Sequence, residues 1–289
     1  MIPEDSASPR NARSQGFDTV RLAAALMVMW GHAWPIYYGF GGYGFGLEHA
    51  GVAIFFGLSG YLVTQSWLRD PSLFRFLARR GLRLLPGLWV CVLLCGLVLA
   101  PLVGARMADA LPWLRWMILV PGGFAVQGAF RGNPGAGYLN TSLWTIPLEA
   151  ACYALLAVLG TLGALRLPTM IGVGLLAGWG CLSLGGPIVP LLLAFAAGSC
   201  VALLGIRLSA PWPDPPTDIS YGMYLYAFPM QQLAVWLVPG AGALGCLALA
   251  LVPTCGLAVL SWRWVERPAL RLKPRRGGRR ASADKNSSP

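Results

Sequence analysis

Apolar segments about 20 residues long recur along almost the whole chain, and they limit what it can fold into. A helix of about 20 residues crosses a hydrocarbon layer about 30 Å thick. Only 11% of the residues are charged, whereas soluble domains usually contain about a quarter. The sequence therefore predicts an all-α polytopic membrane protein. We expect about eight membrane-spanning helices, and at most ten, near 17–38, 50–68, 84–104, 141–164, 168–186, 188–206, 219–238 and 243–263.

One further apolar segment, 111–130, does not fit this pattern. Arg115 interrupts it, and Pro121, Gly122 and Gly123 break it. Such a segment is typical of backbone that lies at the membrane interface or enters and leaves on the same side. We expect an interfacial or re-entrant segment here.

The placement of basic residues predicts the orientation. With eight spans, all but three of the 22 Lys and Arg residues fall on one side, which is the cytoplasmic side by the positive-inside rule. Both termini are then cytoplasmic, and the net charge of +11 reflects topology rather than a nucleic-acid partner. We expect a cytoplasmic tail at 1–16, a membrane domain at 17–272 and a disordered basic tail at 273–289 near anionic membrane lipid.

Arg21 and His32 are two polar residues of the first predicted span. They are eleven residues apart, close to three helical turns, so both lie on one face with about 16 Å between them along the axis. A polar group inside a span usually faces a bundle interior or a water-filled cavity. His32 is therefore a candidate functional residue; the alternatives are that Arg21 only reaches toward water and that His32 only makes a packing hydrogen bond.

Glu149 is the one acidic residue predicted inside a span. A carboxyl group at that depth is either protonated or paired, with an arginine or with His32. Trp144, Glu149 and Tyr153 share one broad helix face. The alternative is a glutamate that only links helices.

Two more groups of side chains are candidates. Ser59 lies in the second predicted span, near Gly57 and Gly60, which permit close helix approach. Arg79, Arg80 and Arg83 lie in the next basic loop and could bind phosphates, although topology alone would also explain arginines there. The seven cysteines show no metal-binding spacing, and we expect no metal site.

Six motifs follow one another in the chain: Arg21-x10-His32, GVAIFFGLSGYLV, RRGLRLLPGLW, LWTIPLEAACY, ISYGMYLYAFP and WRWVERPALRL. In this order the chain resembles the acyltransferase-3 family of integral membrane O-acyltransferases, which includes bacterial exopolysaccharide and O-antigen acetylases. The resemblance covers about residues 17–272. It differs from the family at Ala227, where many members carry a histidine, and in the short interval between Glu149 and Ser220.

The resemblance implies a bacterial inner-membrane enzyme. It implies transfer of an acyl group, usually acetyl, from cytoplasmic acyl-CoA to a hydroxyl of an exported glycan or lipid-linked saccharide, without a tightly bound cofactor. It assigns essential roles to Arg21 and His32, with His32 as the base. The family's R-x-x-R pair maps onto Arg80 and Arg83, and its W-x-x-x-x-E pattern maps onto Trp144 and Glu149.

The chemistry of these side chains suits that reaction. A neutral imidazole can take the proton of an attacking hydroxyl, and Glu149 could orient it. Ser59, Trp144 and Tyr153 are candidates for binding substrate or the oxyanion. The arginines, including Arg79, suit the phosphates of the donor. The alternatives are a proton-coupled transporter or flippase for a polysaccharide precursor, a structural partner of an export complex, and O-acylation of a small secreted metabolite.

Overall fold

The chain is described by a computed structural model that covers residues 16–39, 46–121, 123–184 and 188–274. These residues are helical and form no strand apart from an isolated bridge between Ala125 and Tyr138. The all-α prediction is confirmed for this part of the chain. The predicted tails lie almost entirely outside the described residues.

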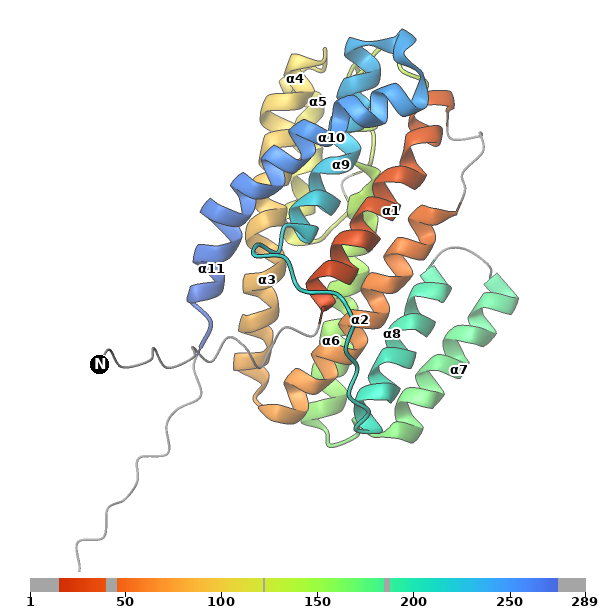
Figure 1. The fold of residues 1–289 in the computed structure, drawn as a ribbon, viewed down its shortest axis with the longest axis vertical. Coiled ribbons are helices and arrows are strands. Elements are labelled where there is room, and N and C mark those ends of the chain that lie inside the picture. Colours follow the sequence, from red (N-terminus) through yellow and green to blue (C-terminus); the bar gives the residue numbers. More distant parts are fainter. Residues whose placement is uncertain (1–15, 40–45, 122, 185–187, 275–289) are drawn as a thin grey trace, which may run out of the picture.

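A helix coincides with each of the eight predicted spans (Figure 1). The third predicted span lies in one continuous helical stretch from Leu73 to Leu102, and the last lies in another from Pro239 to Arg271. The long helices are α1 (Phe17–Tyr38), α2 (Leu47–Arg69), α3 (Leu73–Leu93), α6 (Thr145–Thr161), α7 (Leu167–Leu184), α8 (Ile188–Leu203), α9 (Ser220–Leu237) and α10 (Gly242–Ser261).

Four helices of the described chain are long and apolar enough to cross a membrane, by length and composition alone. They are Leu47–Arg69, Leu73–Leu102, Thr141–Thr161 and Pro239–Arg271. A membrane protein fits these helices, and the count of eight spans remains a prediction. The stretch 111–130 forms only a short 3-10 helix, Leu111–Ile118, followed by irregular chain. It therefore contains no helix of membrane-spanning length.

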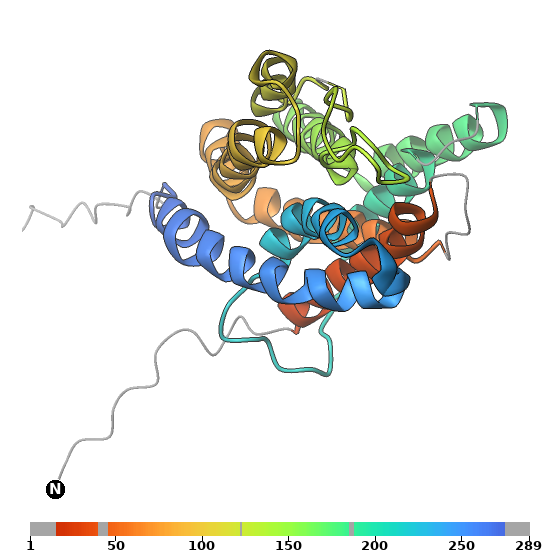
Figure 2. The same ribbon diagram turned by 90° about the horizontal axis from the view of Figure 1, so that it is seen from above.

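Helices α1, α2, α8 and α7 pack side by side, each against the next (Figures 1 and 2). The contact between α2 and α8 is a backbone contact made through glycine. A Cβ atom on Gly60 would overlap the Phe195 carbonyl, and one on Gly198 would overlap the Gly57 carbonyl. This confirms that Gly60 permits close helix approach, which is how small residues act in membrane helix pairs. The partner glycine is Gly198, whereas a Cβ atom on Gly57 would lie 3.7 Å from the Ala194 carbonyl oxygen, an ordinary contact.

Helices α1 and α2 run antiparallel, and two glycines show which residues face each other. A Cβ atom on Gly51 would meet the Ala24 carbonyl oxygen at 2.5 Å. A Cβ atom on Gly31 would lie 2.9 Å from Cβ of Glu48. The start of α2 therefore lies beside the end of α1, and the start of α1 lies beside the middle of α2, where Phe17 contacts Tyr61.

Helix α9 packs against α1, α3 and α10, and it is buried over most of its length. The α8–α9 loop, residues 204–219, crosses the start of α1. The backbone N–H of Asp18 donates to the Asp214 carboxylate at 2.9 Å, and the Thr19 hydroxyl donates to the Pro213 carbonyl. Gly16, at a left-handed φ of 70°, lies against this loop, where a side chain would meet the Trp212 carbonyl oxygen at 2.5 Å. The loop thus holds the beginning of α1 in place.

Candidate active site

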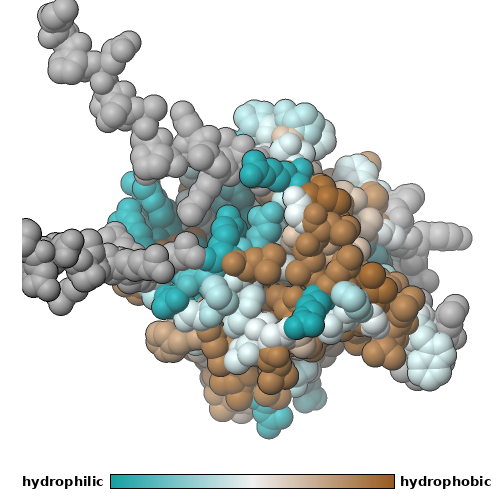
Figure 3. Space-filling view, turned by 90° about the horizontal axis from the view of Figure 1, so that it is seen from below, coloured by the Kyte–Doolittle hydropathy of each residue, from teal (hydrophilic) through white to brown (hydrophobic). Residues whose placement is uncertain are grey.

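A cavity of about 910 Å³ opens among α1, α2, α3, α6 and the start of α9. We call the end of the bundle where α1 starts and α2 meets α3 the basic end, because Arg69, Arg75, Arg79, Arg80 and Arg83 lie there. The cavity lies at this end, and Figure 3 views the molecule from it. Hydrophilic residues gather there beside apolar ones. A volume of this size matches that of a small-molecule or cofactor site.

Three of the lining arginines, Arg79, Arg83 and Arg21, are held by carboxylates. Arg79 pairs with Asp70 at 2.5 Å, and Arg75 pairs with the other oxygen of Asp70 at 2.6 Å. Asp70 lies in the turn between α2 and α3. Hydrogen bonds from Arg75 and Arg79 outweigh burial and hold the pKa of Asp70 well below its ordinary value.

Asp218, at the end of the α8–α9 loop, pairs with Arg83 and Arg21. Arg83 donates to its carboxylate at 2.6 Å, and the Ser220 hydroxyl donates to its other oxygen at 2.6 Å. Arg21 lies 3.9 Å away and also pairs with Asp18 at 3.0 Å. Burial alone would raise the pKa of Asp218, but the charges of Arg83 and Arg21 outweigh it and lower the pKa.

Arg80 differs from these arginines. It forms no ion pair with a carboxylate of the described residues. Its guanidinium lies 6.0 Å from the ring centroids of Phe76 and Tyr153, and its one hydrogen bond is a long one of 3.4 Å to the Ser66 hydroxyl. Its Nε atom is buried and has no hydrogen-bond partner. Arg80 thus places on the cavity wall a cation that has no direct ion pair but lies within electrostatic reach of Glu149.

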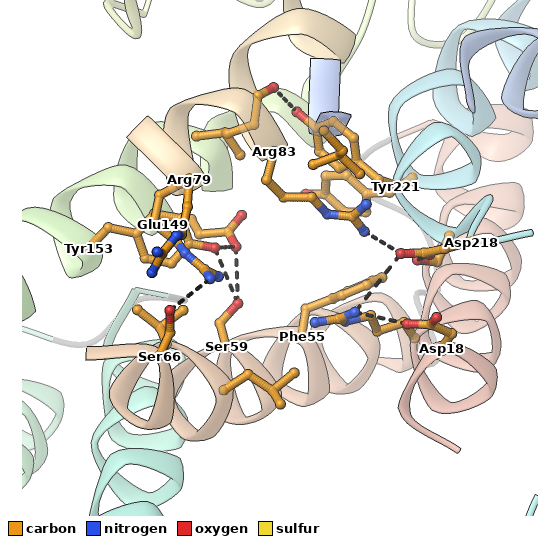
Figure 4. A pocket seen from close by; sticks show the side chains of 18 of the residues that line it. Asp18, Phe55, Ser59, Ser66, Arg79, Arg83, Glu149, Tyr153, Asp218 and Tyr221 are labelled. Atoms are coloured by element: carbon orange, nitrogen blue, oxygen red, sulfur yellow. Dashed lines mark hydrogen bonds and ion pairs between the residues drawn. The ribbon is translucent and has the colours of Figure 1, made fainter. Parts of the chain in front are cut away.

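Glu149 lies on the same cavity wall in a small network (Figure 4). The Ser59 hydroxyl donates to its Oε1 atom at 3.0 Å, and the Tyr153 hydroxyl donates to the same atom. The two hydroxyls are 3.5 Å apart. The partners of Glu149 are therefore two hydroxyl groups from α2 and α6, and not the arginine or His32 considered from the sequence.

His32 lies away from this cavity. Its ring packs edge-on against Phe228 at 5.4 Å and is not part of the cavity lining. The antiparallel register places the His32 level of α1 beside the start of α2, whereas Ser59 is far along α2, near the level of Arg21. Eleven residues of helix separate the two levels by about 16 Å. The structure does not bring Glu149 and His32 together.

The remaining predicted residue, Trp144, packs partly buried against the hydrophobic core and does not line the cavity. Reasoning from the sequence missed Asp70 and Asp218. The signal for Asp70 is its position just before an arginine-rich helix, and Asp218 has no local signal. In the described part of the chain, no group of three or more His, Cys, Asp or Glu side chains could hold a metal ion.

Comparison with known proteins gives two relatives. The chain is 28% identical to an O-acetyl transferase of Shigella phage Sf6 over an alignment of 320 residues, covering 88% of this chain and 96% of the phage protein. It is 27% identical to nodulation protein 10 of Rhizobium leguminosarum bv. viciae over 370 residues, covering 95% and 99% of the two chains. No solved structure matches.

Both alignments are longer than this chain of 289 residues, so they contain gaps at which the relatives carry additional residues. The sequence profile of the acyltransferase-3 family, described as an acyltransferase domain, matches residues 14–270. This match covers most of the chain, including α1, the cavity and α9. The chain therefore belongs to the acyltransferase-3 family of O-acyltransferases and is an enzyme.

Proposed function

We propose that this enzyme transfers an acetyl group from acetyl-CoA to a hydroxyl of an exported glycan or a lipid-linked saccharide. The observation that carries the donor is Arg80, a half-buried cation without an ion-paired carboxylate among the described residues, on the wall of a cavity lined by further arginines. Arginine binds phosphate through several N–H donors at once. The similarity to an O-acetyl transferase supports acetyl as the group and oxygen as its acceptor.

The donor enters from the basic end. Its phosphates contact Arg80 first, and they can then share Arg83 and Arg21 with Asp218. The arrangement suits reversible binding of an anion. The arginines that line the cavity are already held in position by their carboxylate partners, so they need not rearrange when the anion binds. Succinyl-CoA would make the same phosphate contacts. Selectivity between acetyl and succinyl groups therefore depends on residues that lie deeper in the protein than the arginines.

The thiol end of the donor then points along α1 toward His32. The offset of about 16 Å between the levels of Arg21 and His32 suits an extended pantetheine arm between the phosphates and the thioester. His32 takes the proton of the acceptor hydroxyl as its oxygen bonds to the thioester carbonyl carbon. The carbon–sulfur bond breaks, and the thiolate leaves with the proton that His32 returns.

The Glu149 network acts on the donor rather than on His32. Because Glu149 accepts hydrogen bonds from both Ser59 and Tyr153, it fixes the two hydroxyl oxygens at the cavity wall. Their remaining lone pairs can accept from the amide N–H groups of a pantetheine arm. Positioning the arm in this way limits the positions that the thioester can occupy and so favours the reactive geometry.

This arrangement also gives an orientation. Acyl-CoA is a cytoplasmic metabolite, so the basic end faces the cytoplasm of a bacterial inner membrane and the His32 level lies toward the outer side. Positive charge at the basic end agrees with that orientation. The acceptor reaches His32 from the outside.

Transfer of labelled acetyl groups tests the proposal. Membranes containing the wild-type protein or His32→Ala at equal amounts receive acetyl-labelled CoA, and base-labile label is measured in lipid-linked saccharide, surface glycan and secreted small molecules. We expect label in one of the two saccharide fractions with wild type, and its loss with His32→Ala. Asp109→Asn is the control, since Asp109 lies on the short helix Met107–Ala110 and does not line the cavity. Label confined to secreted small molecules would contradict the saccharide acceptor, and absence of label would contradict acetyl transfer.

A further inference from the structure

Three buried polar atoms lie unsatisfied near His32, away from the cavity. The Nδ1 atom of His32, the Oε2 atom of Glu48 and the Oε1 atom of Gln231 are each buried and have no hydrogen-bond partner among the described residues. They come from α1, α2 and α9. Buried polar groups are almost always hydrogen-bonded, and an exception calls for a functional or structural reason.

Gly31 brings Glu48 close to His32. A Cβ atom on Gly31 would overlap Oε2 of Glu48 and would lie 2.5 Å from its backbone nitrogen. The carboxylate therefore occupies the space that a side chain on Gly31 would fill, next to His32 in the chain. Any larger residue at position 31 would push this carboxylate away from α1.

The other oxygen of Glu48 is already used. His49 Nδ1 lies 3.1 Å from Oε1, on the exposed side. This contact turns Oε2 toward α1, where it has no donor. Glu48 lies in the first turn of α2, where the helix dipole favours a negative charge. Its Oε2 atom is therefore directed inward at the N-terminus of α2.

Gln231 completes the surroundings of His32 from α9. Its amide nitrogen donates to the Met29 carbonyl at 2.6 Å, about one turn before His32. Phe228, one turn earlier on α9, contacts the His32 ring. The titratable groups that act electrostatically on His32 are Glu48 and His49, both from α2.

We propose that Glu48 is the positioning carboxylate of His32, stabilising the imidazolium that forms when His32 takes the proton of the acceptor hydroxyl. This proposal rests on the acyltransferase function proposed above. The imidazolium has two N–H donors, and Oε2 of Glu48 is a buried acceptor without a donor. An N–H group of the charged imidazole can therefore supply the donor that this oxygen lacks. The negative charge of Glu48 lowers the energy of that state, and the proton returns to the thiolate afterwards.

Glu48→Gln tests this role, because it keeps the shape and removes the charge. With purified protein, we expect kcat to fall by at least about tenfold, with KM for acetyl-CoA unchanged because the donor's phosphates bind at the other end of α1. The acidic limb of kcat/KM against pH should move down by about one unit, since the imidazolium loses its nearby negative charge. Glu48→Asp should recover part of the activity.

Asp109→Asn, which removes a carboxylate from a short helix elsewhere, is the control and should match wild type. Wild-type kcat and an unmoved acidic limb in Glu48→Gln would overturn the proposal while acetyl transfer stands. A fall in kcat without movement of the limb would also overturn it, as that indicates only a structural role. If Glu48→Gln does not fold, Glu48→Asp is measured instead. An acidic limb of kcat/KM that does not move in Glu48→Asp would then overturn the proposal. Absence of transfer by the wild-type protein would overturn both proposals.

Discussion

Arg21 and His32 lie on one helix, α1, but in two different surroundings. Arg21 lines the cavity and pairs with Asp18 and Asp218, whereas His32 packs against Phe228 beyond the cavity lining. Three turns of helix separate them. In the proposed mechanism, the spacing of the two residues corresponds to the distance between the donor's phosphates and the base.

Removal of Arg80 should weaken donor binding specifically. We expect Arg80→Ala to raise KM for acetyl-CoA about 10- to 100-fold, which corresponds to the loss of charge-assisted hydrogen bonds worth about 1.5–3 kcal/mol, with a smaller change in kcat. Arg80→Lys should recover part of the affinity, because it keeps the charge without the planar fork. Steady-state kinetics at varied acetyl-CoA would show this.

Arg166→Ala is the matched control for Arg80, since it removes an arginine whose contact is with the Gly163 carbonyl outside the cavity. It should leave KM unchanged. Equal KM values for Arg80→Ala and wild type would mean that the donor's phosphates bind elsewhere.

Glu149 and Tyr153 should act as a unit. Because the Tyr153 hydroxyl donates to Glu149, Glu149→Gln and Tyr153→Phe each disturb the same contact. We expect each variant to lower kcat/KM about tenfold and the double variant to lose less than the two losses combined, with a coupling energy of about 0.5–3 kcal/mol. Additive losses in this double-mutant cycle would show that the network has no common role.

The ion pair between Asp218 and Arg83 should make stability depend on pH in the acid range. The pKa of Asp218 is below its ordinary value of 3.8 in the folded protein, so the unfolded chain binds its proton first as pH falls. The stabilisation is therefore complete above about pH 4 and is lost as pH falls through the folded-state value. Asp70, whose pKa is also lowered, adds to the loss in the same range.

Thermal unfolding in detergent, followed by tryptophan fluorescence between pH 3 and 7, would measure this effect. Asp218→Asn should be less stable than wild type at pH 7 by about 2 kcal/mol, and the difference should shrink toward pH 3. The stability of Asp109→Asn should change with pH in the same way as that of the wild-type protein. A constant difference between Asp218→Asn and wild type at every pH would contradict the prediction.

The glycine contact between α2 and α8 should not tolerate a methyl group. Gly198→Ala would force Cβ into the Gly57 carbonyl, and we expect a loss of about 1–3 kcal/mol from the overpacking. Gly256→Ala, on α10 with open space around it, should leave stability unchanged or slightly raised. Unfolding of the two variants in the same detergent compares them directly, and equal stability would mean that the helices can move apart without cost.

The sequence predicted the helices and the polar side chains that line the cavity from α1, α2, α3 and α6, because both depend on local patterns. Apolar length located the eight helical segments, and intramembrane polarity selected Arg21, Ser59 and Glu149, which the structure gathers around one cavity. The predicted link between Glu149 and His32 did not appear, since the level of a residue in a bundle depends on the register of neighbouring helices. Periodicity along a single helix carries no information on that register.

Contacts between residues far apart in the sequence could not be predicted for the same reason. Asp218 meets Arg83 across 135 positions of chain, and nothing beside either residue indicates the other. Nothing in the sequence around Glu48, at the start of α2, indicates which way its side chain points. Its inward direction depends on Gly31 of another helix, and a missing side chain on one helix is a signal only when its neighbour is known.

The α8–α9 loop has a consequence for how the chain is made. The contacts of Asp18 with Asp214 and of Thr19 with Pro213 join residues 196 and 194 positions apart. At a synthesis rate of about 5–20 residues per second, the loop emerges about 10–40 seconds after α1. The start of the first helix therefore forms before its contacts in the loop exist. Assembly of the cavity is consequently a late event of biogenesis, completed only after the loop and α9 have been synthesised.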